Sequence, residues 1–368
     1  GRATPSPPPG AGRMDREAME AMRAHYNRHA HVGRGSQEVE RARLQGRAYP
    51  LKDFHNRIKR QLLRVFASGC PALLDLCCGR GGDIKKWMDV GVKYVLGLDL
   101  AEQEVAEARQ RYEAIKAKKL RFGDVDAAGG VMAAEFFPYD GLGDRRLELD
   151  RQFDVVTCMF AIHYFFVREA AIQSFLRNTA AALRPGGVFI ATFPDGKRIL
   201  GALEGRTEFA SQMLHLRQRW KGRPECFGSP FNMAITDTVT AGGEGSYEYL
   251  VFFNVLLAIA KQCGLEPLLE FGDAELDKCF EAADARRPFK HFCPPFRGDG
   301  DGSLAKASEI FCCAVFRKVG PPPRGPEGPK RAREDAPQPA PGREDAPSKR
   351  PRPEPAAGEQ QGAAAGEQ

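Results

Sequence analysis

The chain has 368 residues, 42% of them hydrophobic, and a formal net charge of +6. This composition supports a buried core and excludes a wholly disordered chain. The best candidate for a membrane span, residues 155–167, contains His163 and is shorter than the roughly 18 apolar residues of a span, so no membrane contact is expected. Residues 1–13 lack the apolar centre of a secretory signal. The ten cysteines show no CxxC spacing, which favours free thiols in a reducing compartment and predicts no metal site.

The two ends of the chain differ in composition from the middle. We expect a disordered and basic segment over 1–21, one folded domain over 22–319, and a disordered Pro/Ala/Gly-rich tail over 320–368. Residues 13–64 hold 13 Lys and Arg against 6 acids, a net of +7, which is typical either of a nucleic-acid contact or of a solvated helix face. In the tail, PKRAR at 329–333 and SKRPRP at 348–353 resemble nuclear import signals. They predict a nuclear protein that binds an import receptor.

Strand-like and helix-like patterns alternate through the middle of the chain. Predicted strands cover 72–77, 94–99, 120–123, 153–160 and 188–193, and predicted helices cover 84–89, 102–118 and 169–183. This alternation is typical of an α/β protein with a doubly wound, mostly parallel sheet, whose ligand lies at the carboxyl ends of the strands. Residues 200–246 are rich in charge and glycine and predict an inserted lid or substrate subdomain. A helix over 249–262 and strands over 265–271 and 310–316 complete seven strands, the last two forming an antiparallel edge.

The first predicted strand ends in a glycine-rich turn, LLDLCCGRGGD at 73–83, and the second ends at Asp99. This arrangement is typical of a nucleoside-binding site, in which the backbone of the turn approaches the ligand and the acid accepts hydrogen bonds from the ribose hydroxyls. Asp75 and Asp83 flank the turn, and their carboxylates would repel the pyrophosphate of NAD or FAD but suit the amino group and sulfonium of S-adenosylmethionine. We expect Asp99 to bind the ribose, and Asp124, at the end of the third predicted strand, to bind the adenine amine. The alternative for Asp75 and Asp83 is helix capping or solvation of a strand end.

Five further segments of the sequence are similar to those of one methyltransferase family. HYN at 25–27, LKDFHNRIKRQLL at 51–63, FDVVTCMFAIHYFF at 153–166, LRPGGVFIATFPDG at 183–196 and EYLVFF at 248–253 occur in this order. In order and spacing they resemble the mRNA cap guanine-N7 methyltransferases, over about residues 22–318. The resemblance implies a Rossmann-like class I methyltransferase fold. It also implies transfer of a methyl group from S-adenosylmethionine to N7 of the terminal guanine of 5′-capped mRNA in the nucleus.

The resemblance also assigns residues to the two sides of the site. On the cofactor side it implies Lys59, Asp75, Cys77, Gly79, Asp83, Asp99, Asp124, Met159 and Tyr164. On the cap side it implies His55, Asn56, Arg80, Arg111, His163, Pro194, Glu248 and Phe311. His163, Tyr164 and Glu248 are expected to orient the guanine for in-line attack. No general base is needed, because guanine N7 carries an unprotonated lone pair.

Each assignment has a plainer alternative. Arg80 and Arg111 could be surface charges, His163 a satisfied core histidine, and Glu248 the cap of the helix that follows it. Four positions also depart from the family pattern, which has Gly, Gln, Asn and Tyr where this chain has Cys77, Met159, His55 and Phe311.

Two other functions therefore compete with cap methylation. One is a related methyltransferase acting on another RNA or on a small molecule, and the other is a catalytically silent protein that binds caps or RNA. Capped RNA is the expected partner, and the resemblance adds a small activating subunit, as in animal members of the family. The catalytic domain is expected to be monomeric.

Overall fold

The computed structural model describes residues 20, 23, 24, 27, 46–124, 130–238, 245–296 and 299–320. Most of the basic amino-terminal segment and both import-like clusters of the tail lie outside the described residues. In the part of the chain that the structure describes, every helix is too short or too polar to cross a lipid bilayer.

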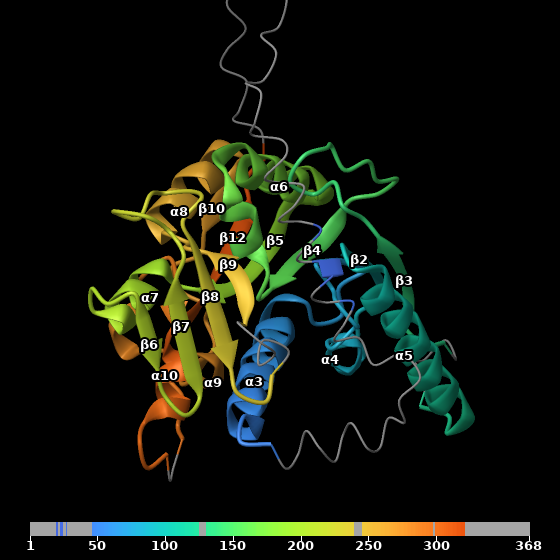
Figure 1. The fold of residues 1–368 in the computed structure, drawn as a ribbon. Helices are drawn as coiled ribbons and strands as arrows, with labels where there is room; N and C mark the ends of the chain where they lie inside the picture. Colours follow the sequence, from blue (N-terminus) through green and yellow to red (C-terminus); the bar gives the residue numbers. More distant parts are fainter. Residues whose placement is uncertain are drawn as a thin grey trace, which may run out of the picture. The chain divides into compact units, whose positions relative to one another are not determined.

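The main sheet has the strand order β10-β12-β5-β4-β1-β2-β3, with β11 paired to β12 (Figure 1). Its strands are β1 Ala72–Leu76, β2 Tyr94–Asp99, β3 Ala133–Pro138, β4 Phe153–Met159, β5 Leu183–Pro194, β10 Leu265–Pro267, β11 Lys290–His291 and β12 Phe311–Lys318. The first five are parallel, and β12 runs antiparallel to β5 and β10. The predicted mostly parallel sheet with an antiparallel edge is confirmed. The short strand β11 was not predicted.

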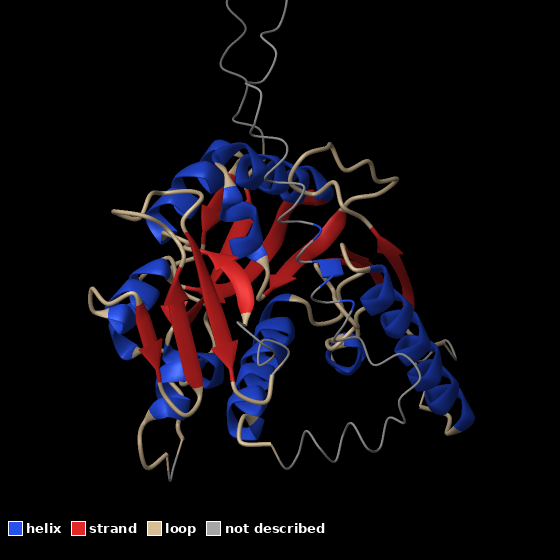
Figure 2. Cartoon of the chain, in the orientation of Figure 1, coloured by secondary structure: helices blue, strands red, loops and turns tan. Residues whose placement is uncertain are grey.

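Helices cover both faces of this sheet, as expected for a doubly wound fold (Figures 1 and 2). Successive strand residues point to opposite faces, so Leu73 and Leu74 of β1 belong to two separate cores. The first core includes apolar residues of α3 Tyr49–Phe66, α4 Ile84–Asp89 and α5 Glu102–Arg121. The second includes those of α6 Glu169–Ala182 and α8 Phe253–Gln262. The remaining helical elements are η1 Ile162–Val167, α7 Gly196–Leu203, α9 Ala274–Asp277, η2 Ala282–Asp284 and α10 Ser303–Glu309.

The region predicted as an insertion forms a second, antiparallel sheet (Figure 2). Its strands, in spatial order, are β6 Glu208–Ala210, β7 Leu214–Gln218, β8 Pro230–Ile235 and β9 Ser246–Tyr249. Strand β9 lies next to η1, which follows β4 of the main sheet. The predicted start of the helix at Tyr249 is wrong, because that residue ends β9 and α8 begins only at Phe253.

The third predicted strand, 120–123, is wrong. Helix α5 continues to Arg121, and the side chains of Leu120 and Phe122 are 50% and 70% exposed. The third strand is instead β3, which pairs with β2 and ends at Pro138. Because β3 is the edge strand of the sheet and buries only Phe136 fully, its sequence lacks the continuous apolar run that marks the central strands.

Candidate active site

The turn after β1 is tied to the tip of β2. Cys77 and Gly79 both have left-handed backbone, with φ of 65° and 49°. This conformation turns the Gly79 N–H toward Asp99, whose Oδ2 accepts a 2.7 Å hydrogen bond. The other oxygen of Asp99 accepts from Ala101 N at 2.9 Å. Each carboxylate oxygen retains a second lone pair, so Asp99 is held in a fixed orientation and can still accept hydrogen bonds from a ligand.

The two acids that flank the turn differ in charge. Burial would raise the pKa of Asp83, but Lys59 and Lys86, whose Nζ atoms lie 2.7 and 2.8 Å from its oxygens, outweigh burial and lower that pKa. Asp75 accepts a 2.5 Å hydrogen bond from Thr157 Oγ1, and its burial, together with the charge of Asp83, raises its pKa to about 8. At neutral pH Asp83 is therefore ionised and Asp75 mostly protonated. Asp83 precedes α4 but makes no capping hydrogen bond, so the capping alternative does not hold for it.

A pocket with about 700 Å³ of open space lies at the tips of these strands. Its walls combine Cys77 after β1, Leu100 after β2, Tyr139 and Asp140 after β3, and Tyr164 in η1. The pocket is open to solvent, and its walls combine apolar side chains with the carboxylates of Asp140 and Asp144. The pocket therefore lies at the carboxyl ends of the parallel strands, as predicted.

Asp140 occupies the place that the sequence reasoning assigned to Asp124. Asp124 lies beyond the end of α5, where it pairs with Lys119 at 2.5 Å and its side chain is 68% exposed. Asp140 lines the pocket at the tip of the true third strand and lies 3.5 Å from Arg23. The signal that could have found it is the segment AAEFFP at 133–138, which is followed two residues later by an acid at 140.

The buried polar pair His163 and Glu248 marks the other side of the site. His163 lies in η1, Glu248 lies in β9 of the inserted sheet, and their Nε2 and Oε2 atoms are 3.4 Å apart. Ser246 Oγ donates to Glu248 Oε1. Both residues are only 2% exposed. Among the described residues, neither ring nitrogen of His163 nor Oε2 of Glu248 has a hydrogen-bond partner. Buried polar atoms without partners are costly, so a ligand that formed hydrogen bonds with these three atoms would be bound favourably.

The protonation of this pair follows from its burial. Burial lowers the pKa of His163 to about 3 and raises that of Glu248 to about 8. In the ligand-free protein at neutral pH, the imidazole is therefore neutral and the carboxyl group mostly protonated. His163 is not a satisfied core histidine. Glu248 lies within a strand four residues before the N-cap of α8, so it does not cap that helix.

Comparison with known proteins decides the family. Residues 11–289 match the family model of the mRNA (guanine-N(7))-methyltransferase domain. The chain belongs to this methyltransferase family. An mRNA cap guanine-N(7) methyltransferase of Caenorhabditis elegans is 30% identical over 269 residues, covering 68% of this chain and 66% of the relative. The mRNA cap guanine-N(7) methyltransferase 1 of Oryza sativa subsp. japonica is 31% identical over 299 residues, covering 74% of this chain and 76% of the relative.

The match covers only part of the length of several relatives. It spans less than two thirds of the C. elegans, Caenorhabditis briggsae, Arabidopsis thaliana and Drosophila melanogaster relatives, at 66%, 62%, 59% and 58% of their lengths. A solved S-adenosylmethionine-dependent methyltransferase from Clostridium acetobutylicum aligns with 80% of this chain and 99% of its own, at 14% identity and a TM-score of 0.43.

Arg80, in the turn after β1, and Arg111, in α5, lie near each other. Arg80 Nε is 3.9 Å from Glu104 Oε2, and Arg111 pairs with Glu107. Burial lowers the pKa of Arg111, and the positive charge of Arg80 contributes in the same direction. The two cations are thus close enough to act on one polyanionic ligand, although each has an acidic neighbour of its own.

The other residues that the resemblance assigns to the cap side are buried or form contacts within the protein. His55 stacks on Phe160 at 5.2 Å, accepts or donates a 2.9 Å hydrogen bond with Ser308 Oγ, and its burial lowers its pKa to about 3. Phe311 is 4% exposed, contacts the His55 ring edge-on and pairs with Pro194 in the sheet. His55 is therefore a satisfied core histidine, and the ring of Phe311 is covered in this conformation.

Two further assignments concern contacts with neighbouring residues. Asn56 Nδ2 donates to the backbone oxygen of Lys52 at 2.8 Å. Met159 ends β4, and its Sδ accepts from Thr192 Oγ1 at 3.8 Å. Neither contact excludes a role toward a ligand, since the amide oxygen of Asn56 and the methyl group of Met159 are not used in them.

The raised pKa values of two carboxyl groups predict that the folded protein loses stability as the pH rises from about 6.5 to 8.5. Asp75 and Glu248 keep their protons to about pH 8 when folded but lose them near pH 4 when unfolded, so stability falls as pH rises. Below pH 6.5, His55 and His163 stay neutral in the folded protein but take up protons in the unfolded chain, so stability falls as the pH falls. Each carboxyl group contributes up to about 2 kcal/mol over this window.

Thermal unfolding of the ligand-free protein at pH 6.5 and 8.5 measures this effect, and a fall of several degrees is expected. Glu248→Gln cannot titrate and should remove about half of the slope. Higher stability of the wild-type protein at pH 8.5 than at 6.5 would contradict the assignment.

Proposed function

We propose that the chain transfers a methyl group from S-adenosylmethionine to N7 of the terminal guanine of 5′-capped RNA, as its relatives are named for doing. The observation that carries the proposal is the unpartnered pair His163 and Glu248, whose chain neighbours Tyr164 and Tyr249 line the pocket at the strand tips. Guanine presents N1–H and N2–H donors, and an ionised Glu248 would accept both. The same carboxylate would repel the N1 acceptor of adenine and the N3 acceptor of cytosine, so this acid would favour guanine.

The cofactor side fits S-adenosylmethionine by the chemistry of its donors. Asp99, oriented by Gly79, would accept hydrogen bonds from the ribose hydroxyls, and Asp140 would meet the adenine amine. Asp83 is ionised, but Lys59 and Lys86 both pair with it, so it would offer acceptor oxygens to the amino group of the cofactor and no net negative charge to the sulfonium. When bound, S-adenosylmethionine supplies an electrophilic methyl group.

The residues of the chain would act by orientation. Neutral His163 would hold the guanine edge, Glu248 would fix the base in its plane, and Tyr164 would separate the base from the adenosine pocket. Arg80 and Arg111 would bind the triphosphate, and Pro194 and Phe311, which are paired in the sheet, would support the base from behind the residues that contact it. In-line alignment of the reacting atoms can lower a barrier by roughly 7 to 11 kcal/mol, so no proton transfer is required of these residues.

Transfer of labelled methyl groups tests the proposal. The protein is incubated with labelled S-adenosylmethionine and RNA that is GpppA-capped, ApppA-capped or uncapped. Label is expected only in the GpppA-capped RNA. Equal labelling of all three would favour a related methyltransferase with another substrate.

A silent paralogue is the second candidate, and the left-handed backbone at Cys77 favours it. A side chain in this conformation costs roughly 1–2 kcal/mol, and the thiol lines the pocket where the family has glycine. Titration calorimetry with S-adenosylmethionine separates the candidates, because a silent paralogue would give no binding heat.

The assignment of Asp140 yields a matched test. Asp140→Ala is expected to weaken S-adenosylmethionine binding by about tenfold or more, since it removes a charge-assisted hydrogen bond. Asp124→Ala is expected to leave the affinity unchanged, although it removes an exposed, ion-paired acid of the same kind. Calorimetry on both variants decides the matter. A loss confined to Asp124→Ala would restore the original assignment.

Compartment and protein partners remain predictions from the sequence. We propose that residues 22–319 are the folded domain and that the tail directs the protein to the nucleus through an import receptor. A small activating subunit is expected only from the family resemblance.

A further inference from the structure

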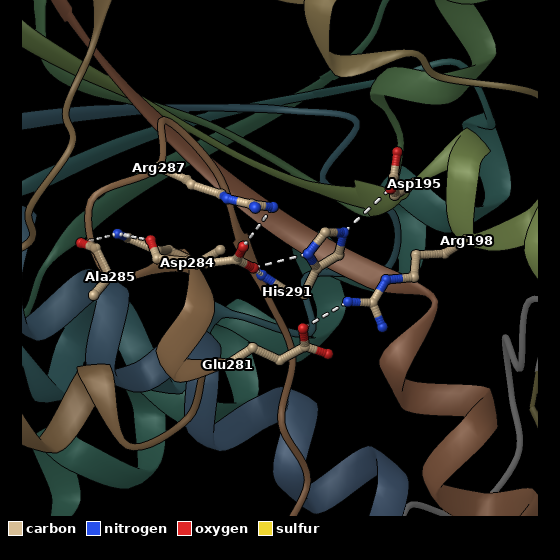
Figure 3. Close-up of polar contacts among 8 residues, drawn as sticks. Asp195, Arg198, Glu281, Asp284, Ala285, Arg287 and His291 are labelled. Atoms are coloured by element: carbon tan, nitrogen blue, oxygen red, sulfur yellow. Dashed lines mark hydrogen bonds and ion pairs between the residues drawn. The ribbon is translucent and has the colours of Figure 1, made fainter.

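A buried histidine outside the proposed site is held between two acids (Figure 3). His291 lies in β11, its Nδ1 is 2.8 Å from Asp284 Oδ2, and its Nε2 is 3.1 Å from Asp195 Oδ2. The backbone N–H of His291 donates to the same Asp284 oxygen at 2.8 Å. Each ring nitrogen therefore faces a carboxylate oxygen, and the ring joins two acids that come from different parts of the fold.

Asp195 is bonded to three elements that the proposed function places around the guanine. It directly follows Pro194, and its backbone N–H donates at 2.8 Å to the oxygen of Ile310, the residue before Phe311. It also forms a bridge with Val251, three residues after Glu248, and the next N–H, that of Gly196, donates to the Val251 oxygen at 2.8 Å. A displacement of Asp195 would therefore be transmitted to Pro194, Phe311 and the end of β9.

The cluster around His291 is not arranged as a metal site, although donor atoms of Glu281, Asp284 and His291 lie within 4.8 Å of one another. Arg198 Nη2 is 2.6 Å from Glu281, and Arg287 Nη1 is 3.3 Å from Asp284 (Figure 3). A cation would have to displace these guanidinium groups, and both ring nitrogens of His291 already face carboxylates. The contacts instead form a closed set of charge-assisted hydrogen bonds.

We propose that His291 is a positioning residue for the cap guanine, acting through Asp195 on the wall formed by Pro194, Phe311 and β9. The inference rests on the proposed cap methylation. It assigns β11 a role in guanine recognition and none in cofactor binding, because Asp99 and the turn after β1 belong to strands on the other side of β4 and β5.

Steady-state kinetics and calorimetry on the full chain test this role. His291→Gln keeps one amide donor and can reach only one acid, and Asp195→Asn replaces one acceptor by a donor. Both are expected to raise KM for GpppA-capped RNA by tenfold or more. The calorimetric Kd for S-adenosylmethionine should stay within twofold of the wild-type value. The double variant His291→Gln with Asp195→Asn should recover part of the loss, since its two amides can bond to each other.

Asp154→Asn is the matched control. Asp154 also joins separate strands through polar contacts, accepting from Ala72 N at 2.9 Å and pairing with Arg184 at 2.5 Å, but it lies at the amino-terminal end of β4, away from the site. This variant is expected to lower Tm with no change in KM for RNA. A lower Tm with an unchanged KM would show that loss of stability alone does not raise KM for RNA.

The outcomes distinguish the two proposals. A wild-type protein without cap methylation overturns the proposed function. A wild-type protein that methylates caps, with KM unchanged in His291→Gln and Asp195→Asn or changed as in Asp154→Asn, overturns the positioning role. Loss of wild-type activity on treatment with EDTA and its recovery with zinc would also overturn it, in favour of a metal site.

Discussion

Replacing Glu248 by Gln is expected to lower kcat/KM for GpppA-capped RNA by about 100-fold or more. The side chain is buried, Ser246 holds one oxygen, and the other oxygen has no partner among the described residues. Gln would present an amide N–H to guanine donors, leaving one of them unpaired in a buried site. Truncating one partner of a buried, charged hydrogen bond costs roughly 2–5 kcal/mol, which corresponds to this loss.

The affinity for S-adenosylmethionine provides the internal control for Glu248→Gln. Glu248 lies in the inserted sheet and Asp99 in the main sheet, so calorimetry with the cofactor is expected to give an unchanged Kd. A variant that retains more than a third of wild-type kcat/KM would show that another group recognises the base. Loss of cofactor binding in parallel would point to damage of the fold instead.

The second large effect is expected for Asp99→Ala, which should weaken S-adenosylmethionine binding by about 100-fold or more. The substitution removes the proposed ribose acceptor and also leaves the N–H groups of Gly79 and Ala101 without their acceptor. Each unsatisfied buried donor costs roughly 1–3 kcal/mol, and the left-handed turn at Gly79 would lose its support.

Asp99→Asn separates the two consequences of the change. The isosteric amide can still accept from one backbone N–H, so this variant should retain more thermal stability than Asp99→Ala while also binding the cofactor poorly. Calorimetry and thermal unfolding are measured on both. Binding of S-adenosylmethionine to Asp99→Ala within threefold of wild type would remove Asp99 from the proposed site.

β1, β2 and β4 could be predicted within one residue because they are largely buried on both faces, whereas β5 begins at Leu183, five residues before its predicted start. β1 is buried at all five positions, and β2 at four of six, so each appears in the sequence as a short, mostly apolar run. β3 could not be found in this way, because an edge strand is only partly covered. The apolar residues Leu120 and Phe122 resembled a strand, although they are exposed at the end of a helix.

The site could be predicted where its residues end central strands, and less well where they depend on distant partners. Asp75 and Asp99 lie beside the turn as expected from their spacing along the chain. The core role of His55 depends on Ser308, which is 253 residues away, and no local pattern reveals that contact. The split in charge between Asp75 and Asp83 likewise depends on Lys59 from a helix that precedes the sheet.

The meeting of His163 and Glu248 has a consequence for how such a site can diversify. One residue belongs to the scaffold that holds the cofactor, and the other belongs to an insertion between β5 and α8. Under the proposed function, substitutions along β9 would therefore change which base is accepted while the strand tips around Asp99 keep their sequence. By the same argument, a lineage carrying this fold would acquire a new methyl acceptor by changing one short sheet and keeping the residues that bind the methyl donor.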